Sequence, residues 1–239
     1  MQIIWTGHSG ELADRASSIV ADLVAHHTSA TIALPTGTTP LPLYARLVAL
    51  CRDGVLELSR ARFFNLDELG GKAASDRQSY AQFLNDNLFG LLGASCGSVR
   101  LLRGDAAAPE QECREYEAEI QEAGGLDLAV LGLGRNGHIA FNEPGSAWTS
   151  RTRCVALTEA TRKSQGGLFA SPEDVPRWGL TVGIATISEA RTILLIVDGE
   201  GKEQALQALL RAIPDPQWPV TALLDHPDLT VIVGPLHAR

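Results

Sequence analysis

The chain has 239 residues, of which 45% are hydrophobic and 20% charged, a balance that allows a substantial buried core. Its net charge of −8 argues against a protein that binds nucleic acid through a basic surface. We expect no membrane span and no secretory signal, because the sequence lacks a run of about 18 apolar residues and a basic N-terminal leader. The cysteines lack the spacing of a zinc site and indicate reduced thiols in a cytoplasmic protein; they are Cys51, Cys96, Cys113 and Cys154.

Apolar periodicity predicts strands and helices in alternation along the chain. Such alternation favours a mostly parallel sheet covered by helices on both faces. The polar stretch 159–175, which contains Gly166 and Gly167, indicates a mobile segment or lid. We expect short strands at 3–5, 31–34, 62–66, 98–102, 126–133, 154–157, 180–184, 192–197 and 229–233. We expect helices at 11–27, after Pro40, at 75–88 with Ser75 as the cap, from Pro109 onward, and at 202–212.

Residues 126–133 are apolar except at two positions and predict a strand buried on both faces. His138 and Glu143 follow this strand, and in open α/β sheets ligands bind at the carboxyl ends of strands. Residues 132–137 also fit the dinucleotide fingerprint G-x-G-x-x-G, which needs a helix at its third glycine. We do not favour that interpretation, because Pro144 follows too soon for a crossover helix.

Three further strand ends carry polar groups. Residues 36–39 combine hydroxyls and a glycine at a strand–helix turn, which suits an anion. Asp67 and Glu68 follow an apolar strand, where the pKa of a carboxyl can rise toward that of a general base. Lys202 begins a helix, where the dipole disfavours a cation unless an anion is bound. Each feature alone fits a turn, a helix cap or a solvated side chain, but together with His138 they predict a site for a small phosphorylated substrate that undergoes proton transfer.

The chain resembles the glucosamine-6-phosphate deaminase/isomerase family over nearly its whole length. The stretches that carry the resemblance occur in family order: LPTGTTPLPLY, FFNLDELGG, LGLGRNGHIAFNEPGS, SRTRCVALTEATR, GLTVGIATI and GEGKEQAL. The resemblance implies an α/β fold, with a single Rossmann-like three-layer domain over residues 1–239. It also implies a mostly parallel central sheet and a lid at about residues 159–176.

The same resemblance implies conversion of glucosamine 6-phosphate and water to fructose 6-phosphate and ammonia, in N-acetylglucosamine catabolism. It implies a cytoplasmic enzyme, classed as a hydrolase as well as an isomerase, that uses no cofactor and no metal. The expected partner is the small amino sugar phosphate, without nucleic acid or membrane. The expected assembly is a monomer or a small homo-oligomer.

By resemblance, Asp67 is the base that moves the C2 proton to C1 through an enediol-type intermediate. His138 opens the pyranose ring with the help of Glu143. Asn136 cannot titrate, so it can only orient His138 or form a hydrogen bond to the substrate. The residues that match phosphate and substrate contacts are Thr36, Gly37, Thr38, Thr39, Lys202, Gly134 and Glu68.

One departure from the family concerns the lid. Well-studied deaminases carry a lid arginine that binds the phosphate, and Gly167 stands at that position here. Arg162 belongs to a neighbouring Thr-Arg pair and is not an obvious replacement. Loss of a bidentate, charge-assisted contact predicts a weaker phosphate site or a shifted substrate.

Other activities stay open from the sequence. The GGLDLAVLGLGRNGH and GEGKEQA stretches also resemble the galactosamine-6-phosphate branch, whose product is tagatose 6-phosphate. A 6-phosphogluconolactonase shares the fold but lacks the FNEPG stretch. A non-catalytic sugar-phosphate sensor would need a DNA-binding output domain, for which we see no room before Ile3 or after Val233. The presence of both Asp67 and His138 favours an enzyme over a sensor.

Overall fold

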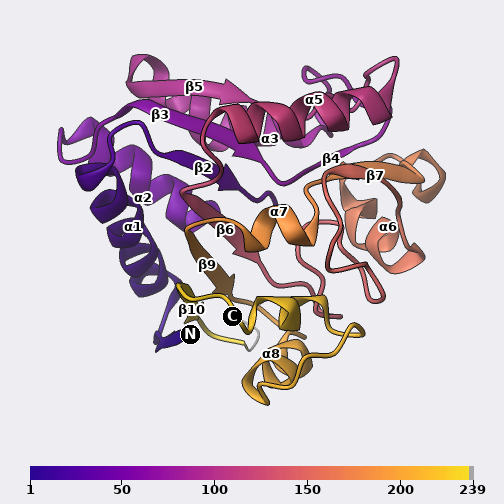
Figure 1. Cartoon of the computed structure of the whole chain (residues 1–239). Helices are drawn as coiled ribbons and strands as arrows, with labels where there is room; N and C mark the ends of the chain where they lie inside the picture. The colour runs from indigo at the N-terminus through magenta and orange to yellow at the C-terminus, as the bar shows by residue number, and fades with distance from the viewer. Residues whose placement is uncertain (237–239) are drawn as a thin grey trace.

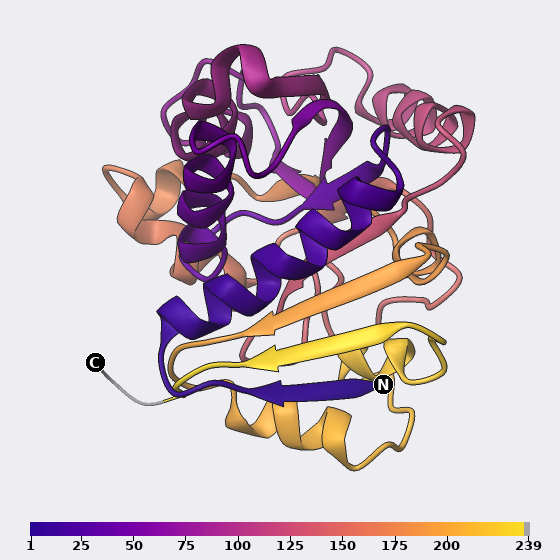
Figure 2. The same ribbon diagram turned by 90° about the vertical axis from the view of Figure 1, so that its left-hand side faces the viewer.

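Residues 1–236, which the computed structural model describes, contain a seven-stranded parallel sheet. Its order is β1-β10-β9-β6-β2-β3-β5, and every neighbouring pair is parallel. Figure 1 shows the whole chain, and Figure 2 shows β1, β10 and β9 side by side at one edge of the sheet. The strands are β1 (Gln2–Trp5), β2 (Thr31–Leu34), β3 (Leu58–Asn65), β5 (Cys96–Arg100), β6 (Leu128–Gly132), β9 (Thr192–Val197) and β10 (Leu229–Val233).

Helices cover both faces of this sheet, so the expected α/β fold with a mostly parallel sheet is confirmed. One face packs against α1, α2 and the helical segment that begins with α3, and the other packs against α5, α7 and α8. In residues 1–236, no helix combines the length and apolar character needed to cross a bilayer. The helices are α1 (Ser9–His26), α2 (Leu41–Arg52), α3 (Tyr80–Leu84), α5 (Pro109–Glu122), α6 (Glu159–Gln165), α7 (Ile184–Ser188) and α8 (Glu203–Leu210).

The central strand β6 shows why residues 126–133 are almost all apolar. Leu128 and Val130 belong to the core on the α1 and α2 face, whereas Ala129 and Leu131 belong to the core on the α5 face. A strand buried on both faces cannot follow the alternating pattern of a half-exposed strand. Residues 133–152 then form irregular structure and turns, so the helix that a dinucleotide fingerprint requires is missing.

A second sheet of three antiparallel strands has the order β4-β8-β7. Its strands are β4 (Asp67–Leu69), β8 (Trp178–Thr181) and β7 (Arg153–Ala156). Asp67 and Glu68, which follow the strand expected at 62–66, belong to a separate short strand, β4, and not to a loop. The strand expected at 180–184 ends at Thr181, since Ile184 already begins α7.

The helix expected at 75–88 begins later, at Tyr80, and its cap is Ser79 rather than Ser75. Ser79 Oγ accepts a hydrogen bond from the Gln82 amide at 2.9 Å. The residues before it are held in turns, in which the amides of Asp76 and Ser79 each donate to a carbonyl three residues earlier. After α3 the chain continues as a π-helical turn, η1 (Asn85–Phe89), and a short helix, α4 (Gly90–Leu92).

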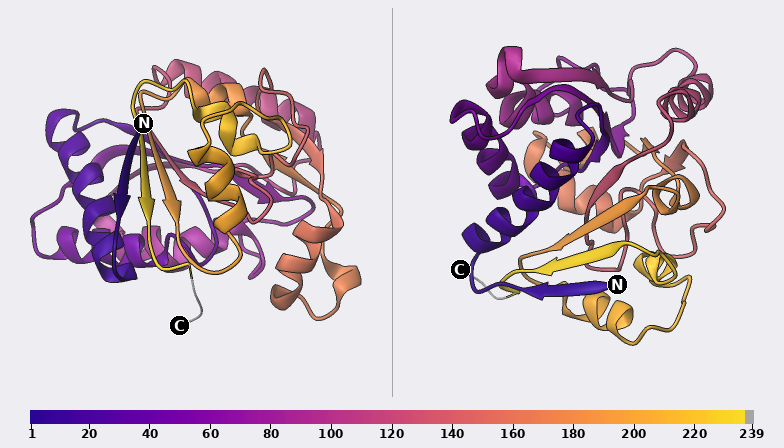
Figure 3. Two further views of the ribbon diagram at one scale, coloured as in Figure 1. Left: turned by 90° about the horizontal axis from the view of Figure 1, so that it is seen from below. Right: turned by 60° about the vertical axis from the view of Figure 1, so that its left-hand side comes forward.

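The 159–175 segment is partly helical. It contains α6 and two 3-10 turns, η3 (Gly166–Leu168) and η4 (Pro172–Asp174). Thr158 caps α6 by accepting a hydrogen bond from the Thr161 amide at 3.2 Å. Figure 3 shows this segment projecting from the body of the molecule, on the side away from β1. The Lys72 ammonium lies 5.0 Å from the centre of the Phe169 ring, which joins the segment to the loop after β4.

Glu112 on α5 is a buried carboxylate whose removal should cost much of the stability of this region. It accepts hydrogen bonds from Arg100 Nη1 at 2.7 Å and from Arg103 Nε at 2.6 Å. We expect Glu112→Ala to lower the free energy of unfolding, measured in urea, by about 3 kcal/mol, because Arg100 is left mostly buried and short of a partner. Glu115→Ala is the matched control, since Glu115 is exposed on the same helix 3.5 Å from Arg103. Glu115→Ala should lower the free energy of unfolding by less than about 1 kcal/mol. Equal losses in the two variants would contradict a special stabilising role for the buried carboxylate of Glu112.

Candidate active site

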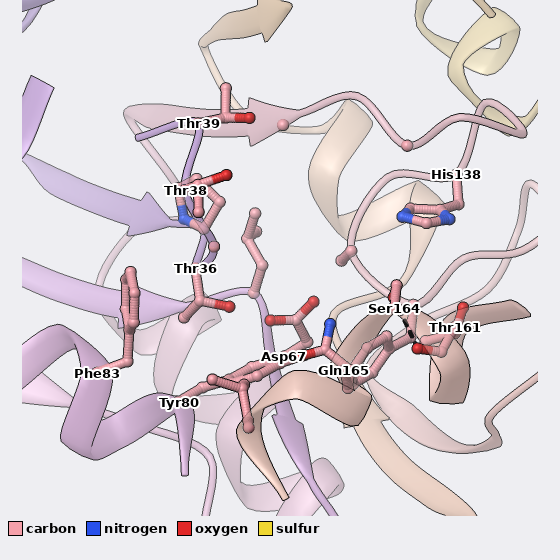
Figure 4. Close-up of a pocket in the computed structure, with 18 of the residues that line it drawn as sticks. Thr36, Thr38, Thr39, Asp67, Tyr80, Phe83, His138, Thr161, Ser164 and Gln165 are labelled. Atoms are coloured by element: carbon pink, nitrogen blue, oxygen red, sulfur yellow. Dashed lines mark hydrogen bonds between the residues drawn. The ribbon is translucent and has the colours of Figure 1, made fainter. Parts of the chain in front are cut away.

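A cavity of about 420 Å³ opens at the carboxyl ends of the central strands. Residues that follow β2, β3 and β6 line it, together with residues of α3 and α6. Figure 4 shows these side chains, with Asp67 and His138 on different walls of the same space. The labelled lining residues are Thr36, Thr38, Thr39, Asp67, Tyr80, Phe83, His138, Thr161, Ser164 and Gln165.

The strand order explains why residues far apart in the sequence meet here. Strands β9, β6, β2 and β3 are consecutive neighbours, and the polar segments after them carry Lys202, His138, Thr36 and Asp67 in turn. Because the strands are parallel, all four carboxyl ends lie at one edge of the sheet. The structure thus brings the four segments together, although Lys202 is not a lining residue and reaches the cavity through Thr39.

Asp67 is a buried carboxylate on the cavity wall. It is 7% exposed, and its Oδ1 atom has no hydrogen-bond partner among the described residues. Burial, and then the charge of Glu68, raise the pKa of Asp67 to about 8. A carboxyl in this setting can exchange a proton with a bound molecule near neutral pH.

Glu68 is not among the residues that line the cavity, so its expected contact with substrate gains no support from the structure and stays a prediction. It is 1% exposed and absent from the cavity lining. Its carboxylate accepts hydrogen bonds from the amides of Leu69, Tyr80 and Ala81 at 2.8–2.9 Å. These contacts satisfy the first amides of α3, and the carboxylate suits that helix end electrostatically. Burial raises the pKa of Glu68 to about 7 even though these amides oppose the shift.

Asn65 holds the corner between β3 and β4, and the sequence did not single it out. The side chain is fully buried. Its amide donates to the Asp67 carbonyl at 2.7 Å, and its Oδ1 atom accepts from the Leu102 amide at 2.9 Å. The Tyr116 hydroxyl donates to the Asn65 carbonyl at 2.7 Å. This network fixes the backbone that carries Asp67.

His138, Glu143 and Asn136 form one polar group beside the cavity. His138 Nδ1 lies 3.7 Å from Glu143 Oε2, just beyond hydrogen-bond distance, and Asn136 Nδ2 donates to Glu143 Oε2 at 2.7 Å. The Thr161 hydroxyl of α6 donates to the other oxygen of Glu143. Burial alone would raise the pKa of Glu143, but the His138 ring, Thr161 and Asn136 lower it to about 2. Glu143 is therefore an ionised partner for the imidazole at neutral pH.

Two glycines make room for the His138 ring and its loop. A Cβ atom on Gly134 would lie 2.3 Å from the imidazole, so only glycine allows the ring to lie over this backbone. Gly137 has φ of +80°, and a Cβ there would approach the Trp218 ring to 2.8 Å. Gly134 also lines the cavity, so the expected contact with substrate stays a prediction beside this role in making room for the ring.

Residues 36–39 form the loop between β2 and α2 and present hydroxyls and backbone to the cavity. Gly37 has φ of +94°, a conformation that favours glycine. Lys202 Nζ donates to Thr39 Oγ1 at 2.9 Å, and burial lowers the pKa of Lys202 to about 8. A cation, hydroxyls and a loop before a helix together suit an anion such as phosphate.

Gly167 lies on the surface of the 159–175 segment. A Cβ added to it would meet nothing within 4 Å, so a larger side chain has space. Arg162 does not compensate for the missing arginine, because its guanidinium donates to the carbonyls of Pro172 and Val175 at 3.1 and 3.3 Å. Within the described residues, no cluster of His, Cys, Asp or Glu could hold a metal ion.

Several lining residues were missed from the sequence. Tyr80 and Phe83 fall in the helix expected at 75–88, and both line the cavity. Ser164 and Gln165 belong to a segment expected to be a lid, but nothing marked them individually. Arg77 also lines the cavity, and no local pattern distinguished it from other loop arginines.

The comparisons with known proteins agree with this geometry. A sequence profile described as glucosamine-6-phosphate isomerases/6-phosphogluconolactonase matches residues 8–232. A glucosamine-6-phosphate deaminase of Thermoanaerobacter pseudethanolicus is 36% identical over 98% of this chain and 92% of its own length. One of Rhodopirellula baltica is 42% identical over 92% of this chain and 87% of its own length.

Solved structures agree as well. A structure described as a monomeric glucosamine-6-phosphate deaminase superimposes with a TM-score of 0.93 at 36% identity and covers 98% of this chain and 97% of that one. A 6-phosphogluconolactonase of Thermotoga maritima gives a TM-score of 0.73 at 23% identity, covering 98% of this chain and 99% of that one, which shows a shared fold.

The expected classification as a hydrolase is wrong. The matching profile is named for isomerases, and the curated relatives are named deaminases. The class that these names support is an isomerase/deaminase. The correction concerns the reaction class alone and leaves the geometry around Asp67 and His138 as described.

We expect Asp67 to titrate near pH 8 in the folded protein, which carboxyl NMR can follow. Since this pKa lies above the unfolded value of about 4, the stability from Asp67 is complete below pH 4 and is lost as the pH rises through 8. Glu68→Gln should lower the pKa of Asp67, because it removes a neighbouring charge. Asp86→Asn, which replaces an exposed acid, is the control and should leave the pKa of Asp67 unchanged. A pKa near 4 for Asp67 in the unaltered chain would contradict this account.

Proposed function

The chain belongs to the family of glucosamine-6-phosphate isomerases and 6-phosphogluconolactonases, and from this we propose that it is a glucosamine-6-phosphate deaminase. The reaction converts glucosamine 6-phosphate and water to fructose 6-phosphate and ammonia. The observation that carries the proposal is Asp67, a buried carboxyl with a raised pKa and a free oxygen, in the same cavity as His138. An isomerisation needs such a base near the C1–C2 bond of the sugar.

The relatives also bear on the alternatives. Those compared at 36–42% identity are named for glucosamine 6-phosphate, so the galactosamine branch is not favoured. The 6-phosphogluconolactonases match at lower identity and support the fold only. An ammonia-release assay on glucosamine 6-phosphate, galactosamine 6-phosphate and the unphosphorylated sugars tests the choice. Release from galactosamine 6-phosphate alone would refute it.

Asp67 carries out the proton transfer in this proposal. Once the sugar is open, the Asp67 carboxylate removes the C2 proton, and an enol forms between C1 and C2. The same carboxyl then returns the proton to C1, which moves the unsaturation to C2 and its nitrogen. Water replaces the nitrogen at C2, and ammonia leaves. The raised pKa suits both halves of the transfer, because the carboxyl must accept and then release the proton.

His138 opens the pyranose ring by moving a proton between O1 and the ring oxygen. The ionised Glu143 lies 3.7 Å from His138 Nδ1 and stabilises the protonated imidazole. Asn136 holds Glu143 by its amide and accepts a hydrogen bond from the His138 amide at 3.3 Å. In this role Asn136 positions the pair and carries no proton.

The phosphate group binds at residues 36–39 and Lys202. This placement follows from the 2.9 Å contact between Lys202 Nζ and Thr39 Oγ1, which leaves a cation at the end of the cavity away from Tyr80 and α6. Phosphate at this end places the sugar between Asp67 and His138. No cofactor or metal is needed for any step of this scheme.

We further propose that residues 159–176 act as a lid on a single domain that spans the chain. Leu168 supports this, because it lines the cavity yet is 55% exposed, as an apolar group at a closing edge would be. Free thiols at all four cysteines are consistent with a cytoplasmic enzyme. We propose a monomer or small homo-oligomer, in line with the monomeric relative.

Asp67→Asn should lower kcat for ammonia release by about 10²–10⁴-fold, because an amide keeps the size of the carboxyl but cannot accept the C2 proton. Substrate KM should change little. Steady-state kinetics of the purified variant measure both constants, with Asp86→Asn as the matched control at an exposed acid. Near-normal turnover by Asp67→Asn would refute the role of Asp67.

His138→Gln should slow the reaction of the closed pyranose more than that of an open-chain substrate analogue. The reason is that His138 lies with Glu143 and serves ring opening, which an open-chain compound does not need. Parallel assays with both substrate forms give the comparison. Equal losses on the two forms would show that His138 takes part in a later step.

A further inference from the structure

The phosphate site proposed above, at residues 36–39 and Lys202, contains a single cation. A sugar phosphate carries close to two negative charges at neutral pH, as its second pKa is about 6. Lys202 supplies one cation, and the lid position that holds arginine in well-studied relatives is Gly167. Arg162 is tied to carbonyls of its own segment. A second cation near Lys202 would complete the site.

Arg135 lies beside Lys202. A Cβ atom built on Gly201 would be 3.0 Å from Arg135 Nε and 3.2 Å from its Cδ, so the arginine side chain runs along the backbone just before Lys202. Gly201 has φ of +77° and no side chain, which leaves this path open. Arg135 is exposed and forms no hydrogen bond or ion pair with any residue in 1–236.

The topology places Arg135 between the other two parts of the phosphate site. Arg135 follows β6, Lys202 follows β9 and Thr39 follows β2, and β6 lies between β9 and β2 in the sheet. The bond from Lys202 to Thr39 therefore spans the end of the strand from which Arg135 emerges. Arg135, Lys202 and Thr39 thus come from segments that follow three neighbouring strands.

We propose that Arg135 and Lys202 together grip the phosphate group of the substrate, and that Arg135 supplies the charge that the lid lacks. A guanidinium presents paired donors that match phosphate oxygens, so it adds direction as well as charge. This inference rests on the proposed function for the identity of the substrate, but not for the binding of phosphate itself.

The nearby charges fit this arrangement. Asp198 and Arg135 act on Lys202 in opposite directions, and burial has the largest effect on its pKa. Asp198 also accepts a hydrogen bond from Ser9 Oγ at 2.9 Å, so its carboxylate interacts with Ser9 as well as with Lys202. Two cations close together repel each other until an anion binds between them, which favours a doubly charged ligand.

The first test is calorimetric titration of inorganic phosphate, together with KM for glucosamine 6-phosphate. Arg135→Gln should raise the Kd for phosphate and the KM for the sugar phosphate by about tenfold to a hundredfold. This is the effect of losing one charge-assisted contact. Arg135→Lys should keep part of the affinity. Arg52→Gln, at an exposed arginine on α2 outside the cavity, is the matched control and should change neither constant. Unchanged phosphate affinity in Arg135→Gln would overturn the proposal.

Arg77 is the rival cation, because it lines the cavity. If Arg77→Gln weakens phosphate binding and Arg135→Gln does not, the second cation is Arg77 and the proposal fails. A large effect confined to Arg135→Gln supports it. If phosphate binds through Arg135 but no ammonia is released from any amino sugar phosphate, the proposed function fails and this inference stands.

A second experiment asks whether Arg135 replaces the lid arginine. Gly167→Arg has space in the structure and should bring a charge to the same phosphate when the lid closes. It should therefore improve phosphate affinity more in the Arg135→Gln variant than in the unaltered chain. An equal gain in phosphate affinity in the unaltered chain and in Arg135→Gln would show that residues 135 and 167 do not bind the same phosphate group. That result would contradict the proposal.

Discussion

The buried corner at Asn65 is the contact on which the site depends. The Asn65 side-chain amide joins three parts of the chain there. Its nitrogen donates to the Asp67 carbonyl, and its oxygen accepts from the Leu102 amide and from the Tyr116 hydroxyl on α5. At this corner the chain leaves the large parallel sheet and enters the small antiparallel one. Asp67 is the first residue after the turn, so its direction into the cavity follows from the geometry of the corner rather than from its own contacts.

Two carboxyls are buried side by side immediately after this corner, and their surroundings divide their roles. Glu68 is surrounded by three amide donors and closes the end of α3, whereas Asp67 has an oxygen without a partner. The cost of burying a carboxylate is therefore partly offset for Glu68 and left in place for Asp67. That residual cost raises the pKa of Asp67. The end of α3 and the proposed base are parts of one electrostatic arrangement.

Much of this could be read from the sequence, for reasons that the structure makes clear. Residues 126–133 were identified as a strand buried on both faces because a strand between two layers of helices needs apolar residues at nearly every position. Polar groups after four strands predicted one site because parallel strands end together. Gly167 stands where well-studied family members carry a lid arginine, and such a departure is visible without coordinates.

Other features depend on partners that are distant in the sequence. Residues 67–69 form a strand only because β8 pairs with them, and a strand of three residues has no periodicity of its own. Ser79 caps α3 in place of Ser75 because turns hold the intervening backbone, which helix patterns do not reveal. Glu68 and Asp67 differ in role because of the amides of Tyr80 and Ala81. Arg135 lies inside a recognised motif, and its closeness to Lys202 follows from strand order alone.

The proposed lid, residues 159–176, is in contact with the group proposed to open the sugar ring. The Thr161 hydroxyl of α6 donates to Glu143, which is also the partner of His138 and Asn136. Any displacement of α6 changes the number of donors on Glu143. Fewer donors raise the pKa of Glu143 and weaken its support of the imidazolium. The contacts around Glu143 are therefore complete only when α6 is in place.

The pairing of β1 with β10 has a consequence for how the protein is made. Gln2 to Trp5 form an edge strand whose only neighbour in the described sheet is residues 229–233. On a ribosome, β1 therefore emerges long before β10, and it must stay unpaired until β10 has been made. β10 also pairs with β9, the strand that leads to Lys202. Completion of this edge of the sheet, and with it the neighbourhood of Lys202, is expected to wait for β10, as non-local strand pairing forms late.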